Sequence, residues 1–174
     1  YHDVVDEAGP LYHQVKTDVK SPKSEILKAY YPQTISKKTL ISHFNWLKNN
    51  GYNVVGWQEV IDAQAGKKPL PDKAVLLTFD DGYESFYRIV FPLLKEYNYK
   101  AVFAVVTSLV DQAPNSMVAF GDSRIARGAF VTWPQIKEMS DSGLVEIASH
   151  THNMHRAIKA NPGGTAYPAS FSAQ

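Results

Sequence analysis

The sequence predicts an α/β domain in which parallel strands alternate with helices. Four short apolar segments indicate buried strands, at residues 52–57, 74–79, 101–106 and 144–148. Segments with helical spacing of apolar residues separate them. Parallel strands need a crossover connection, usually a helix, so this alternation is typical of β/α units with right-handed crossovers.

Composition places the chain among ordinary globular proteins, with 44% hydrophobic and 20% charged residues in 174. A net charge of +1 gives no reason to expect nucleic acid or another polyanion as partner. The absence of cysteine excludes disulfides without revealing the compartment. No apolar run approaches the roughly 20 residues of a membrane span, and no signal-peptide pattern opens the chain. Both ends look cut, as in a fragment of a longer precursor.

The first half of the chain begins with residues 1–4 (YHDV), which resemble the end of a strand. Residues 5–34 have little periodicity and several X-Pro steps, and they predict a long loop. Ser36 is the expected N-cap of a helix that ends near Gly51. A short helix is expected at residues 59–65.

The second half contains two further helices. Residues 85–97 carry an apolar stripe, and Pro92 is expected to break or kink this helix. Residues 107–131 are polar and predict a loop. Residues 133–142 predict a helix with Thr132 as its N-cap.

Two adjacent carboxylates, Asp80 and Asp81, follow the strand at residues 74–79, and Gly82 comes next. In parallel α/β folds the chemistry lies at the C-terminal ends of strands. One carboxylate could bind a cation while the other works as a base. The alternative is a polar turn in which Asp80 caps the following helix.

Three histidines, His150, His152 and His155, follow the strand at residues 144–148. Any one of them alone would be an ordinary surface or core residue. Neutral imidazole together with carboxylate is a typical donor set for zinc or a similar divalent ion. The histidines after one strand, with Asp-Asp-Gly after another, therefore predict a shared metal site.

Residues 78–82 (TFDDG), and Ser149-His150-Thr151 followed by His155, resemble two motifs of the polysaccharide deacetylases, carbohydrate esterase family 4 with the NodB-homology fold. The resemblance implies a distorted (β/α)7-type barrel. It also implies that Asp80 is the catalytic base and that Asp81, His150 and His155 bind the metal. Zinc is the first expectation, with nickel or cobalt as alternatives.

The spacing of the histidines departs from the commoner family pattern. Most members place the two ligands four apart, but residue 154 is Met, so His155 lies five after His150. His152 is therefore a rival ligand. A spacing of five resembles the subgroup that deacetylates poly-β-1,6-N-acetylglucosamine, a biofilm exopolysaccharide. Further stretches point to the same subgroup: residues 1–4, 66–71, 82–87 and 120–122.

The resemblance also gives a role to the start of the chain. In the family, a His after the last strand serves as general acid, so residues 1–4 suggest a circular permutation with His2 in that role. The alternative is that His2 is an ordinary polar residue near a terminus. The sequence predicts about four strands and the strand end at residues 1–4, whereas the family barrel needs about seven strands. Residues 1–174 are therefore expected to be the N-terminal portion of the deacetylase domain, without the family's Arg and hydrophobic groove.

The resemblance implies metal-dependent removal of N-acetyl groups from poly-β-1,6-N-acetylglucosamine, in an extracytoplasmic location. Substrate-binding residues stay unassigned. Tyr1, Tyr83 and Trp133 could stack on sugar rings or could simply be packing residues. A catalytically silent carbohydrate-binding module that retains the fold is the alternative. An aspartyl phosphotransferase is disfavoured, because its second Asp would not be adjacent and the histidines would have no role.

Overall fold

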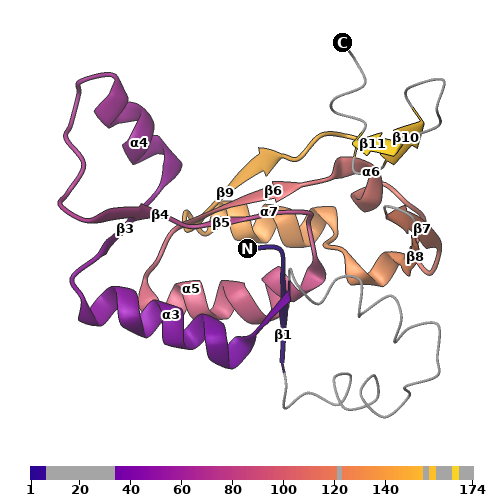
Figure 1. The fold of residues 1–174 in the computed structure, drawn as a ribbon, viewed down its shortest axis with the longest axis horizontal. Helices are drawn as coiled ribbons and strands as arrows, with labels where there is room; N and C mark the ends of the chain where they lie inside the picture. The colour runs from indigo at the N-terminus through magenta and orange to yellow at the C-terminus, as the bar shows by residue number, and fades with distance from the viewer. Residues whose placement is uncertain (7–33, 121–122, 155–156, 160–165, 169–174) are drawn as a thin grey trace.

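A computed structural model of the chain (Figure 1) describes residues 1–6, 34–120, 123–154, 157–159 and 166–168. Most of the loop predicted for residues 5–34 lies outside these ranges. Strand β1 (Asp3–Val5) corresponds to the strand end that residues 1–4 resemble, and it pairs in parallel with β2 (Thr34–Ser36), a strand that the sequence did not predict. Among the described helices, none combines the length and apolar character that crossing a membrane requires.

The central sheet is parallel, as predicted. It has the order β5 (Thr78–Phe79), β6 (Ala101–Val105), β9 (Val145–Ser149), with Val105 opposite Ser149 at its C-terminal edge. A second parallel pair joins β3 (Asn53–Val55) to β4 (Ala74–Leu76), the segment that leads into β5. The prediction of an α/β fold with parallel strands is confirmed.

The start of the chain lies beside β5. The amino group of Tyr1 donates to the Thr78 carbonyl at 3.0 Å, and the Asp80 amide donates to the Tyr1 carbonyl at 2.9 Å. These two backbone bonds place His2 next to the carboxylate pair, although the residues are almost eighty positions apart in sequence.

Three helices share one core with the central sheet: α3 (Lys37–Asn49), α5 (Phe91–Tyr97) and α7 (Trp133–Asp141). Phe86 stacks on Phe103 of β6 with ring centroids 4.0 Å apart. The predicted N-caps are confirmed, because Ser36 accepts from the Thr39 amide and Thr132 accepts from the Gln135 amide.

The helix between β3 and β4 lies away from this core (Figure 1), whereas Val54 of β3 and Val75 of β4 pack against it. The predicted strand at residues 52–57 is shorter, since Trp57 already begins α4 (Trp57–Gln64). The helix starts early because a carboxylate from β9 stabilises it: Glu146 Oε1 accepts from the Trp57 amide at 2.7 Å. This partner lies 89 residues away, so no local signal announces it.

Pro92 distorts its helix without ending it. A π-helical turn, η2 (Phe86–Val90), runs directly into α5, and the Phe91 amide donates to the carbonyl of Phe86, five residues back. Proline lacks an N–H and its ring crowds the preceding turn, and a widened turn accommodates both effects.

The prediction of a loop at residues 107–131 was wrong in part. This stretch contains α6 (Thr107–Val110), an antiparallel hairpin of β7 (Met117–Phe120) and β8 (Ser123–Ala126), and the 3₁₀ turn η3 (Arg127–Ala129). The segment folds because it builds a second, smaller core, whose buried members are Val106, Leu109, Val118, Phe120 and Phe130. A further unpredicted pair, β10 (Ala157–Lys159) with β11 (Ala166–Pro168), is antiparallel.

Candidate metal and catalytic site

The predicted site residues gather at the C-terminal ends of two strands of the central sheet. Asp80 and Asp81 follow β5, and His150 follows β9, with β6 between the two strands. The His150 amide donates to the Val105 carbonyl at 2.9 Å, which continues the β6–β9 ladder to the first histidine. The sheet thus brings together residues that lie about seventy positions apart in the sequence.

The turn after β5 has a left-handed backbone at two successive residues. Asp81 has φ of 74° and Gly82 has φ of 85°. Glycine adopts this conformation freely, whereas aspartate does so less often, and such residues concentrate at functional sites. The turn is held from outside, because the Gly82 carbonyl accepts from the Val131 amide at 2.9 Å.

Asp81 is the centre of the site. Its side chain is 2% exposed, and each of its carboxylate oxygens faces a different imidazole. Oδ2 lies 3.1 Å from His2 Nδ1, and Oδ1 lies 3.4 Å from His150 Nε2. The two histidines are about 40% exposed, so the carboxylate is buried beneath a rim of imidazoles that solvent reaches.

The donor atoms that are described fit a divalent ion. Two ligands each about 2.1 Å from a tetrahedral ion lie roughly 3.4 Å apart, which matches the separation of Asp81 Oδ1 from His150 Nε2. Carboxylate and imidazole are also the donor types that zinc accepts. His155, the third predicted ligand, lies outside the described residues. Within the described ranges, no three His, Cys, Asp or Glu side chains are grouped as a metal centre.

The other two predicted residues, Asp80 and His2, lie next to Asp81. Asp80 is half-buried, and its backbone is tied to Tyr1 through the bond between its amide and the Tyr1 carbonyl. This pairing helps to bring His2 to the site. The structure therefore places Asp80, Asp81, His150 and His2 at the same end of the central sheet.

The rival ligand His152 has a different neighbour. Its side chain is exposed, and its Nδ1 lies 2.9 Å from the Thr107 hydroxyl at the start of α6. Thr151, between His150 and His152, has φ of 66°.

Asp3 is a residue of the site that sequence reasoning missed. The Ser85 hydroxyl donates to Asp3 Oδ1 at 2.5 Å, which links β1 to the segment that follows the Asp-Asp-Gly turn. Burial raises the pKa of the Asp3 carboxyl, and the bond from Ser85 opposes this in part. The position of Asp3 directly after His2 was the only available signal.

The aromatic residues considered for sugar stacking have different surroundings. Tyr83 stacks on Phe130 at 5.3 Å, as a packing residue does. Trp133 is 48% exposed, and its indole N–H donates to Asp111 Oδ1 at 2.9 Å. Tyr1 stacks on Phe79 at 4.9 Å.

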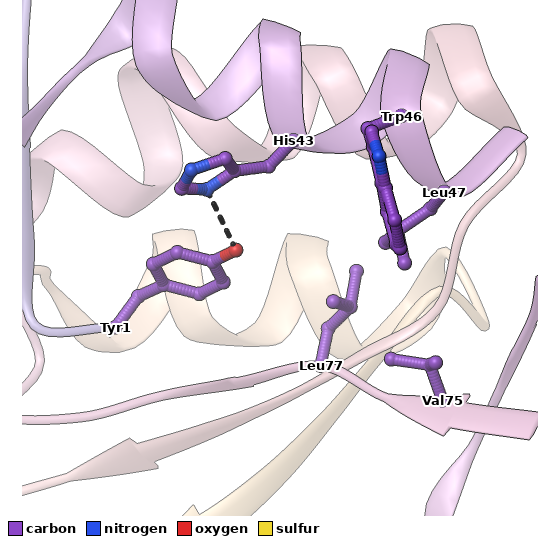
Figure 2. A pocket seen from close by; sticks show the side chains of 6 residues that line it. All are labelled: Tyr1, His43, Trp46, Leu47, Val75 and Leu77. Carbon is purple, nitrogen blue, oxygen red and sulfur yellow. Dashed lines mark hydrogen bonds between the residues drawn. The ribbon is translucent and has the colours of Figure 1, made fainter. Parts of the chain in front are cut away.

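A pocket of about 250 Å³ lies between α3 and the strand that leads to the site. The Tyr1 hydroxyl lies 3.1 Å from His43 Nδ1 across it (Figure 2). The lining residues are Tyr1, His43, Trp46, Leu47, Val75 and Leu77. None of the predicted catalytic or metal residues lines this pocket, so it does not belong to the site around Asp81.

Comparisons with known proteins give matches over more than half of the chain. The polysaccharide deacetylase family model matches residues 67–169, more than half of the chain. The poly-beta-1,6-N-acetyl-D-glucosamine N-deacetylase of Escherichia coli K12 is 47% identical over 135 residues, 78% of this chain and 20% of that protein. The chain thus spans about a fifth of the length of this curated relative.

Solved structures are similar over larger shares of their chains. A de-N-acetylase from Aggregatibacter actinomycetemcomitans superposes with a TM-score of 0.80 at 50% identity, covering 97% of this chain and 59% of that one. The deacetylase domain of BpsB from Bordetella bronchiseptica gives 0.74 at 47% identity, covering 78% of this chain and 52% of that one.

Proposed function

The chain belongs to the polysaccharide deacetylase family, and from this premise we propose that it removes N-acetyl groups from poly-β-1,6-N-acetylglucosamine in a metal-dependent reaction. The observation that carries the proposal is the buried Asp81 carboxylate, with His2 and His150 on its two oxygens at the strand ends. The names of the E. coli and A. actinomycetemcomitans relatives support N-deacetylation.

In this proposal Asp81, His150 and His155 would hold the divalent ion, with zinc expected before nickel or cobalt. When bound, such an ion lowers the pKa of a coordinated water and polarises a carbonyl oxygen. The burial of Asp81 suits this role, because a buried carboxylate needs a compensating positive charge.

Asp80 would act as the general base. It neighbours the proposed ligand Asp81, and the backbone bond to Tyr1 fixes the start of its turn. It would take the proton from the attacking water as the bond to the acetyl carbon forms. Asp80 and Asp81 then divide the work between proton transfer and metal binding, which two carboxylates at one strand end allow.

His2 would act as the general acid. Its Nδ1 faces Asp81 Oδ2, and this contact orients the ring and leaves Nε2 to carry the proton. Transfer of that proton to the sugar nitrogen lets the C–N bond break, which releases acetate and a free amine.

We also propose that residues 1–174 are part of a circularly permuted barrel of the NodB type, in which β1 takes the place of a final strand. The pairing of Tyr1 with Thr78 and Asp80 supports this, because it puts the start of the chain beside β5. A biofilm exopolysaccharide lies outside the cytoplasm, so the proposed function implies that this protein acts in an extracytoplasmic location.

Acetate release from an N-acetylglucosamine oligomer tests the function. The metal-loaded full-length protein should release acetate, a chelator should stop it, and added Zn²⁺ or Co²⁺ should restore it. Activity that survives complete removal of metal would refute the metal-dependent mechanism. A metal-loaded protein that binds the oligomer without releasing acetate would favour the carbohydrate-binding alternative.

A further inference from the structure

The junction between β6 and α6 lies between the two halves of the site. On one side is the turn after β5 that carries Asp80 and Asp81, the carboxylate turn. It packs closely against the end of β6, because a Cβ added at Gly82 would lie 3.5 Å from the Val105 side chain. On the other side, the Val105 carbonyl accepts from the His150 amide. Whatever fixes this junction therefore also fixes the separation between Asp81 and His150.

The first residues of α6 contact the segment after His150. The Thr107 amide donates to the Thr151 carbonyl at 3.3 Å, and the Ser108 amide donates to the His152 carbonyl at 2.9 Å. The Thr107 hydroxyl adds a bond of 2.9 Å to His152 Nδ1. Of these three bonds, only the last depends on side chains at both ends.

These bonds hold a strained backbone. Thr151 has φ of 66°, a conformation that β-branched residues adopt rarely. Such strain persists only where the surrounding structure imposes it. Thr151 itself contributes through its hydroxyl, which accepts from the Met154 amide at 3.2 Å. The strained residue lies directly after His150, so a relaxed backbone there would move the imidazole away from Asp81.

The far end of α6 is anchored by Arg127, which is 6% exposed. Its guanidinium donates to the carbonyls of Val110, Phe130 and Val131 at 2.8, 2.8 and 2.9 Å. Val131 in turn donates to the Gly82 carbonyl of the carboxylate turn. The short helix α6 is thus tied at one end to residues 150–152, the histidine segment, and at the other end to the turn that carries Asp81.

We propose that Thr107 and His152 are a pair of positioning residues that hold the histidine segment in its strained form. The pair keeps His150 facing Asp81 in the metal-free protein. This inference rests on the proposed function, because it assumes that Asp81 and His150 share an ion. It also assigns a role to the one histidine of the cluster that the mechanism does not use.

The test measures Co²⁺ binding to the metal-free full-length protein by calorimetry, without substrate. Thr107→Val keeps the shape and removes the hydroxyl, and it should weaken Co²⁺ affinity about 10-fold, as loss of an outer-shell partner does. Thr107→Ser keeps the hydroxyl and should bind within about twofold of the parent. Thr39→Val is the control, because it removes a hydroxyl that bonds Ser36 at 2.9 Å in α3. It should leave the affinity unchanged.

A double-mutant cycle separates a pair from two independent effects. His152→Ala should weaken Co²⁺ binding as much as Thr107→Val does, and the double variant should be no weaker than either one. Affinity in Thr107→Val equal to that of the parent, Thr107→Ser as weak as Thr107→Val, or losses that multiply in the double variant would each overturn the inference alone. A parent protein that binds no Co²⁺ would instead overturn the proposed metal site, and the inference with it.

Discussion

Replacing Arg127 by Met should destabilise the protein strongly, although this residue touches none of the proposed catalytic groups. Arg127 is 6% exposed, and its guanidinium donates to three backbone carbonyls from α6 and the segment after η3. Methionine fills much of the same volume but supplies no donor. The variant would therefore leave three carbonyls buried in the smaller core without their present partners.

The expected loss follows from these contacts. Each buried acceptor left unpaired costs about 1–3 kcal/mol. The variant no longer has to bury the guanidinium, which returns part of this cost. We expect a net loss of about 3–5 kcal/mol in the free energy of unfolding, which is below the sum of about 3–9 kcal/mol for three unpaired acceptors. At about 2–4 °C per kcal/mol for a chain of this size, the midpoint of thermal unfolding should fall by roughly 6–20 °C.

Urea unfolding followed by circular dichroism measures this free energy by linear extrapolation. Arg124→Met is the matched control, because Arg124 lies three residues earlier in β8, is exposed and makes one bond of 3.1 Å to the Met117 carbonyl. The control should stay within about 0.5 kcal/mol of the parent. If Arg127→Met costs no more than Arg124→Met, the anchoring of α6 by this cation is refuted.

Three further predictions concern the site itself. Burial raises the folded-state pKa of Asp3 above its ordinary 3.8, so the parent should lose stability as pH rises through and above this value. In urea unfolding, the stability of Asp3→Asn relative to the parent should increase as pH rises from 3 to 7, and an advantage of the variant that grows as pH falls would contradict this. Asp80→Asn should lower kcat for acetate release by about 10²–10⁴-fold while Zn²⁺ stoichiometry stays at one ion per chain; lost stoichiometry would make Asp80 a ligand. His155→Ala should abolish stoichiometric Zn²⁺ binding, whereas His152→Ala should keep one ion at lower affinity, and the reverse would make His152 the ligand.

Local sequence patterns were sufficient for much of the architecture. The helix beginning after Ser36 and the one beginning after Thr132 have the predicted caps, because capping depends on residues three apart. The parallel direction of β5, β6 and β9 followed from the alternation of strand and helix. Asp81 and His150 could be expected to meet, because both follow strands whose C-terminal ends lie at one edge of the sheet.

Local patterns failed where a short segment depends on a distant partner. The hairpin of β7 and β8 seemed too polar to fold, but Val118 and Phe120 bury themselves against Phe130. The start of α4 was placed too late because Glu146, which stabilises it, comes from another strand. Periodicity within a window of about ten residues carries no trace of such contacts.

The sequence by itself determined which chemical groups this protein brings to the site: adjacent carboxylates after one strand and imidazoles after another. The tertiary structure alone decided how Asp81 is shared, with one oxygen toward His2 and the other toward His150. It also decided that His152 contacts Thr107. The physical reason is that a residue's type and its neighbours in sequence fix what it can bind, whereas the direction of its side chain depends on strands that pair across the chain.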